Sequence, residues 1–589
     1  MAGKSLRCVM SLLIVIGGVV VILALAYWLY GGLLQRLFQL DPKTKTPAVT
    51  MRDDVDYVPI PAHFLFGQHF SAIAAAGPIV GPIVAGVAFG WGPALAWILI
   101  GAIFIGGVHD FSALVASIRH QARSITEVVR QNVTHRAYML FLGFIWITLV
   151  YIIVAFTDVT AQSFVGRMTL EDGSVVSGAG IATSSLLYLV LPVFMGLLMR
   201  HMKLSVGWAT LIFLPLVGVA IWAGQKIPFD VETLFNVSPA TALKIWDVVL
   251  LAYCGIAGVI PMWILLQPRG YLGGCFLYTA LIGAAAGLVV GGKTVQYPAF
   301  NAWTAPNGDT LFPFLFITIA CGACSGFHAI VAAGTSSKQL RCEPDARVVG
   351  YGAMLLEALV AAVSLACVMM LAANNPMVKK APNFIYANGI GEFLGVLGVA
   401  KAFGISFGLL AFATFVYDTL DICTRLGRYI IHELTGWKSL NSRWGATAIM
   451  TAVPLLFVMR TVTDSQGNAI PVWKAFWTLF GASNQLLAAL TLLGITVWLV
   501  HRYRARWIWF VMGVPTVFMY VMSVWALGMI LRAKLAMAGW WSDPVPWVAA
   551  ILIVLAAMML NEGIIVLIRT LTNGVQEPAQ KASGAHLDM

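Results

Sequence analysis

Long apolar runs, each followed by a short polar segment, recur along almost the whole chain of 589 residues. A run of about 20 apolar residues is the length that crosses the hydrocarbon core of a membrane as one helix. Of all residues, 60% are hydrophobic and only 10% are charged, whereas a soluble protein carries about 25% charged residues. This leaves too little polar surface to cover a soluble enzyme. The sequence therefore predicts an all-α polytopic membrane protein with about fifteen transmembrane helices.

The candidate spans lie near residues 8–30, 64–89, 93–118, 137–157, 180–199, 204–223, 246–267, 271–291, 311–333, 348–374, 402–424, 444–460, 475–500, 507–531 and 545–569. When the loops are counted alternately, about two thirds of the 36 Lys and Arg fall on one side, which the positive-inside rule makes cytoplasmic. The main clusters on that side are Arg119/Arg123/Arg130/Arg136, Lys338/Arg341/Arg347, Arg425/Arg428/Lys438/Arg443 and Arg502/Arg504/Arg506. We therefore expect the N-terminus outside and the C-terminus in the cytoplasm.

The net charge of +11 is consistent with this topology and does not indicate a polyanionic partner. Nucleic-acid binding needs a basic patch or arm, and these cations are instead spread over the loops between apolar runs. We therefore expect membrane lipid around the chain and no nucleic acid. Cys321 and Cys324 have the CxxC spacing of metal sites, but no second pair or histidine cluster accompanies them. No metal site is predicted.

The second candidate span contains several helix-breaking residues at mid-membrane depth. These are Gly77, Pro78, Gly81 and Pro82. Each proline lacks an amide hydrogen and clashes with the preceding turn, and glycine weakens a helix, so the pattern predicts a break. Carbonyl groups freed at such a break must face protein or a cavity, because lipid cannot bind them. In transporters built from inverted repeats, a matching span in the other half is also interrupted, and the substrate binds at the repeat interface.

Two spans could provide the second break. Five spans later, the breakers are Gly255, Gly258 and Pro261. That span enters the membrane from the opposite side, as a five-plus-five inverted repeat (LeuT-like) requires, and we prefer this interpretation. The alternative is a seven-plus-seven repeat, in which Gly326 breaks the span near 311–333. In the preferred repeat, Ser325 could join freed carbonyls around a coupling Na⁺.

Ionisable side chains inside apolar spans are costly, by roughly 2.5 kcal/mol or more for a charge, and each is a candidate functional residue. His69 lies two turns before the first break, where it could carry a proton or bind a substrate carboxylate. With the helix breakers of both spans it completes the candidate substrate-binding set. The candidate ion-coupling residues are His69, His328, Ser325 and Glu357, and the candidate gating residues are His109 and Asp110.

Two further polar pairs are expected to have structural roles. Asp421 and Arg425 are spaced i, i+4 and should pair along one helix face. Asn484 and Gln485 lie inside an apolar span, where side-chain amides usually bond neighbouring helices together.

Six long stretches have an unusual sequence. They are FLFGQHFSAIAAAGPIVGPI (64–83), GGVHDFSALVASIRHQARSI (106–125), GVIPMWILLQPRGYL (258–272), LFPFLFITIACGACSGFHAIVAAGTSSKQL (311–340), GYGAMLLEALVA (350–361) and LFGASNQLLAALTL (479–492). They resemble the carbon starvation protein A family of bacterial inner-membrane transporters, and the resemblance covers most of the chain. It implies uptake of small carbon sources, pyruvate in some members, with peptides proposed for others. It also implies kinship with the amino acid–polyamine–organocation transporters, whose core is usually a five-plus-five inverted repeat.

The chain departs from the pattern of this family at three places. Gln68 precedes His69 where the family usually has two histidines, and Cys324 stands where other members have a different residue. The long insertion of larger members, between the tenth and eleventh spans, is absent.

These observations predict four regions. They are a first transmembrane helix and cytoplasmic linker (1–63), a transporter core (64–435), peripheral transmembrane helices (436–570) and a disordered cytoplasmic tail (571–589). We expect a secondary transporter that imports a small carboxylate, pyruvate above all, with protons in the carbon-starvation response. Peptide uptake and Na⁺-coupled symport are the alternatives. Neither enzymatic activity nor a cofactor is expected beyond the coupling ion, H⁺ or Na⁺.

Overall fold

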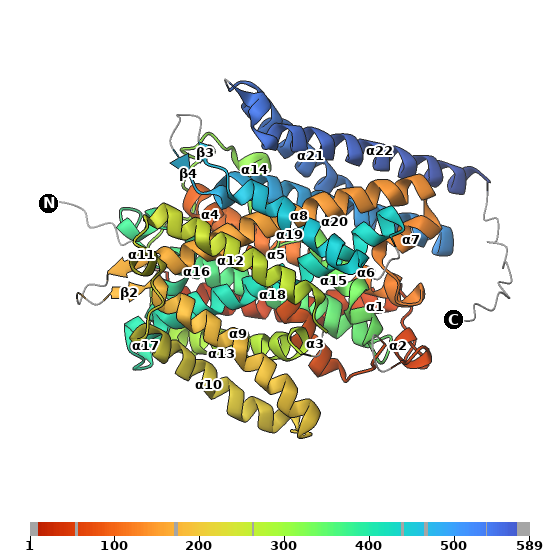
Figure 1. The fold of residues 1–589 in the computed structure, drawn as a ribbon. Helices are drawn as coiled ribbons and strands as arrows, with labels where there is room; N and C mark the ends of the chain where they lie inside the picture. Colours follow the sequence, from red (N-terminus) through yellow and green to blue (C-terminus); the bar gives the residue numbers. More distant parts are fainter. Residues whose placement is uncertain are drawn as a thin grey trace.

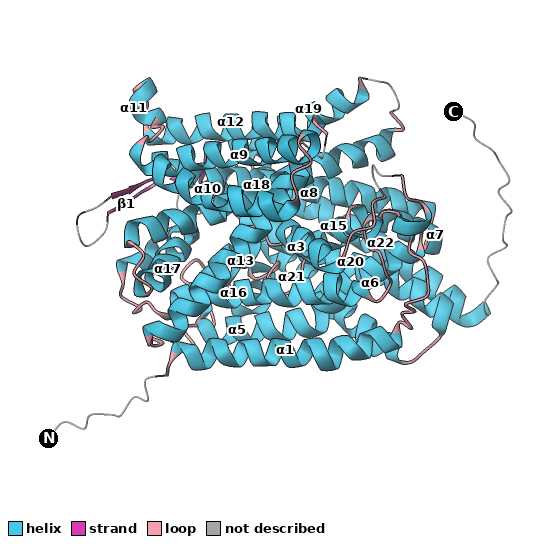
Figure 2. Cartoon of the chain, turned by 90° about the horizontal axis from the view of Figure 1, so that it is seen from below, coloured by secondary structure: helices cyan, strands magenta, loops and turns pink. Residues whose placement is uncertain are grey.

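The computed structural model describes residues 10–53, 57–169, 173, 175–261, 264–437, 441–463, 469–537 and 539–573. Figures 1 and 2 show that helices make up nearly all of this part of the chain and that most of them run side by side through one bundle. The first nine residues and most of the predicted tail lie outside the described residues. The last helix runs to Asn573, three residues into that tail.

The helices of the first half of the chain are α1 (Leu12–Leu37), α2 (Pro47–Thr50), α3 (Ala62–Ile73), α4 (Gly77–Phe89), α5 (Trp91–Gly101), α6 (Gly107–Arg119), α7 (Ile125–Asn132), α8 (His135–Val165), α9 (Gly178–His201), α10 (Val206–Lys226), α11 (Val231–Phe235), α12 (Pro239–Val259) and α13 (Leu266–Gly291). The later helices are α14 (Leu311–Thr318), α15 (Gly326–Gly334), α16 (Ala353–Met369), α17 (Pro382–Val396), α18 (Lys401–Thr435), α19 (Ser442–Val458), α20 (Val472–Tyr503), α21 (Val514–Leu535) and α22 (Pro544–Asn573).

Short elements complete the fold. The π-helical segments are η1 (Ala102–Gly106), η3 (Arg347–Gly352) and η5 (Trp509–Gly513), and the 3₁₀ turns are η2 (Ser336–Lys338), η4 (Pro376–Lys379) and η6 (Trp540–Ser542). Two small antiparallel hairpins pair β1 (Arg167–Thr169) with β2 (Val175–Ser177) and β3 (Val462–Thr463) with β4 (Ala469–Ile470).

Twelve helical segments of the described residues are long and apolar enough to cross a membrane, and the bent pair α3–α4 makes a thirteenth. The two remaining predicted spans coincide with the interrupted pair α14–α15 and with α19, an apolar helix of 17 residues. The multi-pass helical architecture is therefore confirmed, and the count of fifteen crossings stays a prediction.

Helices α8, α18 and α20 lie at the centre of the bundle and are buried along most of their length. By contrast, α1, α10 and α22 expose many large apolar side chains, as helices facing lipid do. In Figure 1, α21 and α22 lie along one edge of the bundle and α10 lies along the opposite edge.

The first predicted break is confirmed. Helix α3 ends at Ile73, α4 begins at Gly77, and their axes differ by 50°. The break comes just before the predicted residues because Pro78 occupies the first turn of α4. Amide groups in the first turn have no acceptor within the helix, so the missing amide hydrogen of proline costs no hydrogen bond there.

The second break is not where the five-plus-five interpretation places it. Helix α12 is continuous, so Gly255 and Gly258 lie in an intact helix and Pro261 follows its end. Glycine alone costs a helix only about 1 kcal/mol, which packing can offset. The carbonyl groups at this helix end are bound instead by guanidinium groups: Arg425 donates to Ala257 and Ile260, and Arg428 donates to Gly258.

The chain is interrupted between α14 and α15, over residues 319–325. This is the alternative position, with Gly326 as the first residue of α15. The predicted break near Pro261 is therefore wrong and the one near Gly326 is confirmed.

The helices beside the two breaks pack in a reciprocal way. Helix α4 packs on α16, and α15 packs on α6. Helix α13 packs on α3 and α18, while α20 packs on α14, α15 and α8. The short helix α7 contacts α8 and α20, as α17 contacts α18 and α13, and the pairs α8–α18 and α12–α19 also pack together.

Candidate functional site

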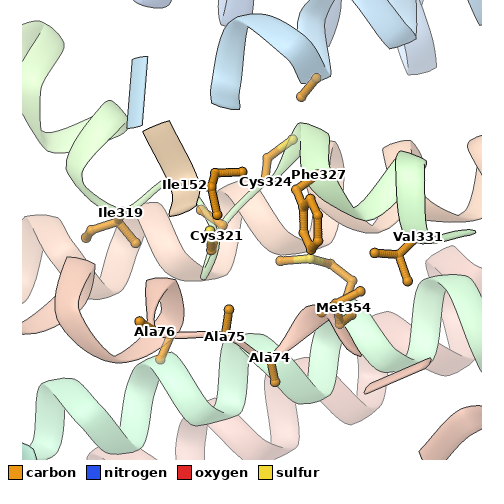
Figure 3. Packing of buried hydrophobic residues seen from close by; sticks show 14 of the residues in the cluster. Ala74, Ala75, Ala76, Ile152, Ile319, Cys321, Cys324, Phe327, Val331 and Met354 are labelled. Carbon is orange, nitrogen blue, oxygen red and sulfur yellow. The ribbon is translucent and has the colours of Figure 1, made fainter. Parts of the chain in front are cut away.

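The two helix breaks lie against each other in the buried core. A Cβ atom added at Gly77 would be 2.3 Å from Cys321 Sγ, and one added at Gly81 would be 2.4 Å from the carbonyl oxygen of Thr318. Only glycine allows α4 to approach the second break this closely. Figure 3 shows Cys321 and Ile319 of the second break near Ala74–Ala76 of the first. The structure thus brings the predicted residues 77–82 together with residues 318–322.

Helix α20 holds the second break in place through two side-chain amides. Asn484 Nδ2 donates to Ser325 Oγ at 3.0 Å, and its Oδ1 accepts from the backbone amide of Phe327 at 3.0 Å. Gln485 Nε2 donates to the carbonyl oxygen of Phe316 at 2.5 Å. The expected bonding of neighbouring helices by these two residues is confirmed.

Four ionisable side chains from three helices meet beside the second break, and we call them the acid–base cluster: His109, Asp110, His328 and Glu357. All four are fully buried. Asp110 Oδ1 lies 2.8 Å from His109 Nδ1, and its Oδ2 lies 2.8 Å from His328 Nδ1. His328 Nε2 lies 3.2 Å from Glu357 Oε2. The predicted gating pair and two of the predicted coupling residues therefore belong to one cluster.

The arrangement of the acid–base cluster provides a position for a proton. Asp110 can accept a hydrogen bond from the Nδ1–H of each histidine, which leaves His328 Nε2 as the atom that faces Glu357. With neutral histidines and two ionised carboxylates, the cluster would hold two negative charges away from water, which is strongly unfavourable. A proton shared between Glu357 and His328 Nε2 removes one of these charges. The contact between α15 and α16 is thus a candidate position for a proton.

Among the described residues, the other predicted site residues form no hydrogen bond with the acid–base cluster, although His69 is close enough to His328 to interact with it electrostatically. His69 Nδ1 is 2.7 Å from Ser336 Oγ in η2. Gly255 and Gly258 of α12 face threonines of α18 and α19 and take no part in either break. Their predicted role in substrate binding has no support in the geometry.

A second buried group was missed by sequence reasoning, and we call it the arginine cluster: Arg269, Asp418, Asp421 and Tyr253. Arg269 lies in α13 and is fully buried. Its guanidinium binds Asp418 Oδ1 through Nε at 2.6 Å and contacts Asp421 and Tyr253 through Nη1. The predicted pairing of Asp421 with Arg425 is therefore wrong, because Arg269 takes Asp421.

Arg269 was missed because the predicted span boundaries leave it in the loop between 267 and 271. In the structure the arginine belongs to the first turn of α13, so it does not count among the loop cations. The signal that could have found it is a single arginine just before one predicted span, in a chain where another span contains two carboxylates, Asp418 and Asp421.

Two cavities lie at opposite ends of α13 and α18. The α7 cavity has a volume of about 760 Å³ and is lined by α7, the start of α8 and α13, and the ends of α15 and α18. The α17 cavity, of about 480 Å³, is lined by residues of α17, by the other end of α13 and by the start of α18. Helix α13 is about 40 Å long at 1.5 Å per residue, which is the scale of a membrane.

Both cavities have more basic than acidic side chains in their lining. In the α7 cavity the basic residues are Arg123, Arg130, Lys338 and Arg425, against Glu127 and Glu433. In the α17 cavity Glu392 lies between Lys293 and Lys401, with Nζ–Oε distances of 2.8 and 2.6 Å. An excess of positive charge in a cavity attracts anions.

A multi-pass helical protein with two interrupted helices in contact, buried ionisable groups beside them and a cavity with charged side chains at each end has the features of a membrane transporter. The chain belongs to the carbon starvation protein CstA family, whose sequence model matches residues 10–383 and 370–526. The resemblance noted in the sequence is thereby confirmed, and the chain is a transporter and not an enzyme.

Characterised relatives share about 30% of the sequence. The pyruvate/proton symporter BtsT of Escherichia coli (strain K12) is 32% identical, over 86% of this chain and 79% of that protein. The peptide transporter CstA of Campylobacter jejuni is 31% identical, over 86% of this chain and 78% of that protein. The alignment with a crystal structure of an Eremococcus coleocola manganese transporter includes 88% of this chain and 98% of the transporter chain, with 15% identity and a TM-score of 0.44.

Proposed function

We propose that this chain imports a small carboxylate, pyruvate above all, together with protons across the bacterial inner membrane. The observation that carries the proposal is the acid–base cluster, which offers a buried proton position beside the second break. The excess positive charge in both cavities supports an anionic substrate. The name of the relative BtsT, a pyruvate/proton symporter, points the same way.

The proposed core is a five-plus-five inverted repeat that contains an inserted pair of helices. The first repeat comprises α3–α4, α5–α6, α8, α12 and α13, and the second comprises α14–α15, α16, α18, α19 and α20. The inserted pair α9–α10 explains why the breaks are seven spans apart in a five-plus-five repeat. The reciprocal packing of α4 on α16 and of α15 on α6 supports it, as do the equivalent positions of α7 and α17.

The proposed transport cycle alternates between the two cavities. Following the predicted topology, we place the α7 cavity on the cytoplasmic side and the α17 cavity outside. Half-helices that end at a break can pivot, since no continuous backbone hydrogen bonding ties them to their other half. His328 lies on the half-helix α15 and Glu357 on α16, so a proton at their contact changes how firmly α15 is held. The proton would thereby bias the two states.

A peptide substrate is the second candidate, because several relatives at about 30% identity are named peptide transporters. The α7 cavity, at about 760 Å³, lies within the range of small-ligand sites and could admit a short peptide as well as pyruvate. In the Na⁺-coupled alternative, Ser325 would be a ligand, and its hydroxyl is bonded to Asn484.

Counterflow in proteoliposomes tests the substrate. We expect labelled pyruvate to exchange with unlabelled pyruvate and with similar small acids in the absence of Na⁺. Competition by short peptides without exchange of pyruvate would instead favour the peptide alternative. A second measurement tests the coupling ion: an inward pH gradient should drive accumulation. Uptake that requires Na⁺ and ignores the pH gradient would refute proton coupling.

The variant Glu357→Gln tests the acid–base cluster directly. It removes the proton position but keeps the shape of the side chain, so counterflow should continue while accumulation driven by a pH gradient is lost. Ser364→Ala is the matched control, because Ser364 lies two turns further along α16 and its hydroxyl bonds only the carbonyl of Val360 in its own helix. Normal accumulation by Glu357→Gln would remove this cluster from the coupling mechanism.

A further inference from the structure

The arginine cluster lies between the α7 cavity and the first helix break. Leu266 and Gln267, which precede Arg269 in α13, line the α7 cavity, as does Ile422, which follows Asp421 in α18. On the other side, Asp418 Oδ2 accepts a hydrogen bond of 2.9 Å from Ser71, in the last turn of α3 before the break. The guanidinium therefore lies between residues that line this cavity and the end of α3 at the first break.

The two carboxylates of the arginine cluster are held differently. Asp418 has a partner at each oxygen, Arg269 at Oδ1 and Ser71 at Oδ2. Asp421 contacts Arg269 and Tyr253 through Oδ2 alone, and its buried Oδ1 has no hydrogen-bond partner among the described residues. Asp421 is thus the less completely bound acid and the one that can leave.

The formal charges of the cluster favour an exchange of carboxylates. One guanidinium and two carboxylates carry a net charge of −1, and a buried excess charge is unfavourable. If Asp421 takes a proton and a carboxylate anion then binds Arg269, the net charge is −1 again. The empty and the loaded cluster therefore carry the same charge, so loading adds no further charge to the interior.

We propose that Arg269 is the group that binds the substrate's carboxylate, and that Asp421 takes its place when no substrate is present. To load, Asp421 accepts a proton at Oδ1 and its ion pair with Nη1 breaks. The substrate carboxylate then accepts N–H bonds from the guanidinium, in the geometry that suits Arg and carboxylate. This inference rests on one part of the proposed function, namely that the substrate carries a carboxylate. A free peptide also carries one, at its C-terminus.

Several other polar groups face Arg269 and Asp421 and belong to the same electrostatic environment. They are Tyr417, Asp418 and Cys423 of α18, Tyr253 and Cys254 of α12, Tyr188 of α9, Ser71 of α3 and, one turn further along α18, Arg425. None of these besides Asp418 is a carboxylic acid. Because Asp418 keeps a partner at each oxygen while Asp421 Oδ1 has none among the described residues, the pH dependence of substrate binding between pH 5 and pH 8 is expected to come from Asp421.

Binding of pyruvate to the purified full chain, measured by calorimetry at pH 5.5 and pH 8, tests the proposal. Pyruvate itself stays ionised over this range, as carboxylates do above about pH 4. The wild type should bind pyruvate but not its uncharged methyl ester. Its affinity should fall as the pH rises, by up to about tenfold per pH unit, because binding then requires a proton on Asp421.

Three variants separate the roles of the two residues. The double variant Arg269→Gln/Asp421→Asn keeps the formal charge of −1 and should bind pyruvate about 10- to 100-fold more weakly, as expected for loss of charged hydrogen bonds. Asp421→Asn alone should bind pyruvate at pH 8 as well as at pH 5.5. Arg428→Lys is the control, because Arg428 is also buried but bonds the carbonyl group of Gly258 and stacks on Tyr429, and none of its described contacts is with the arginine cluster. The pyruvate affinity of this variant should stay unchanged.

Two results would overturn the proposal. The first is that the folded double variant binds pyruvate as tightly as the wild type. The second is that Asp421→Asn keeps the pH dependence of the wild type, and this result decides the question if the double variant does not fold. If the wild type binds dialanine but not pyruvate, pyruvate is not the substrate. The inference about Arg269 is then tested by comparing the affinity for dialanine with the affinity for dialanine amide, which lacks the carboxylate. Equal binding of the acid and the amide would then refute a carboxylate site at Arg269.

Discussion

The contact between the two helix breaks can be tested at Gly77. In Gly77→Ala, the new Cβ would lie 2.3 Å from Sγ and 2.4 Å from Cβ of Cys321. Carbon atoms in contact are about 3.8 Å apart, so the two breaks must separate by about 1.4 Å. Forcing an extra methyl group into a close-packed core costs about 1–3 kcal/mol. Since 1.4 kcal/mol is a factor of ten in an equilibrium, a cost of this size borne by one transport state should shift the balance between the states by roughly 5- to 150-fold.

Two measurements check this expectation. We expect a lower thermal unfolding midpoint in detergent and slower counterflow in proteoliposomes. The matched control is Gly143→Ala in α8, where a Cβ would meet nothing within 4 Å. That variant should be as stable as the wild type or slightly more so, because alanine favours a helix.

The double variant Gly77→Ala/Cys321→Gly adds a methyl group at the first break and removes the Cβ and Sγ atoms that it would meet at the second, so it should recover most of the lost stability. A double-mutant cycle should give a coupling free energy of about 1–3 kcal/mol between the two positions. If Gly77→Ala behaves like Gly143→Ala, or if the two substitutions are simply additive, the breaks are not in contact and the proposed core is wrong.

Two more predictions concern the second break and the α17 cavity. Asn484→Ala removes the bonds to Ser325 and to the start of α15 and should lower the free energy of unfolding by about 1–3 kcal/mol, and an unchanged unfolding midpoint would contradict this. Burial raises the pKa of the Glu392 carboxyl, but hydrogen bonds and charges from Lys293 and Lys401 outweigh it and hold that pKa below its usual range. A lowered pKa in the folded state means that Glu392 stabilises the fold above the usual glutamate pKa of about 4.3, an effect lost as the pH falls through the folded value. Glu392→Gln should therefore unfold roughly 1–2 °C below the wild type at pH 7. The difference should vanish below about pH 4, and a gap that persists there would refute the ion-pair explanation.

Local features of the sequence determined the membrane class, the positions of the spans and the first break. Apolar runs of about 20 residues have one stable arrangement in lipid, so each predicted span coincides with a helix or an interrupted pair. Pro78 also acts locally, because a proline fits the first turn of a helix without loss of a hydrogen bond, whereas Pro82 is accommodated inside α4. The motifs of the six long stretches were enough to recognise the family, which the comparison confirmed.

Only the tertiary structure decided where the second break lies and which polar groups meet. Gly255 and Gly258 look like breakers in the sequence, but packing and the guanidinium groups at the end of α12 keep that helix intact. Asp110 is 218 positions before its partner His328, and Glu357 lies on yet another helix. No spacing rule relates residues on separate helices. Asp421 had a plausible partner four residues away, and the structure gave it Arg269 from another helix instead. Local rules fail at such places because the partner of a buried charge is chosen by the three-dimensional packing, which excludes water and leaves only the nearest opposite charge.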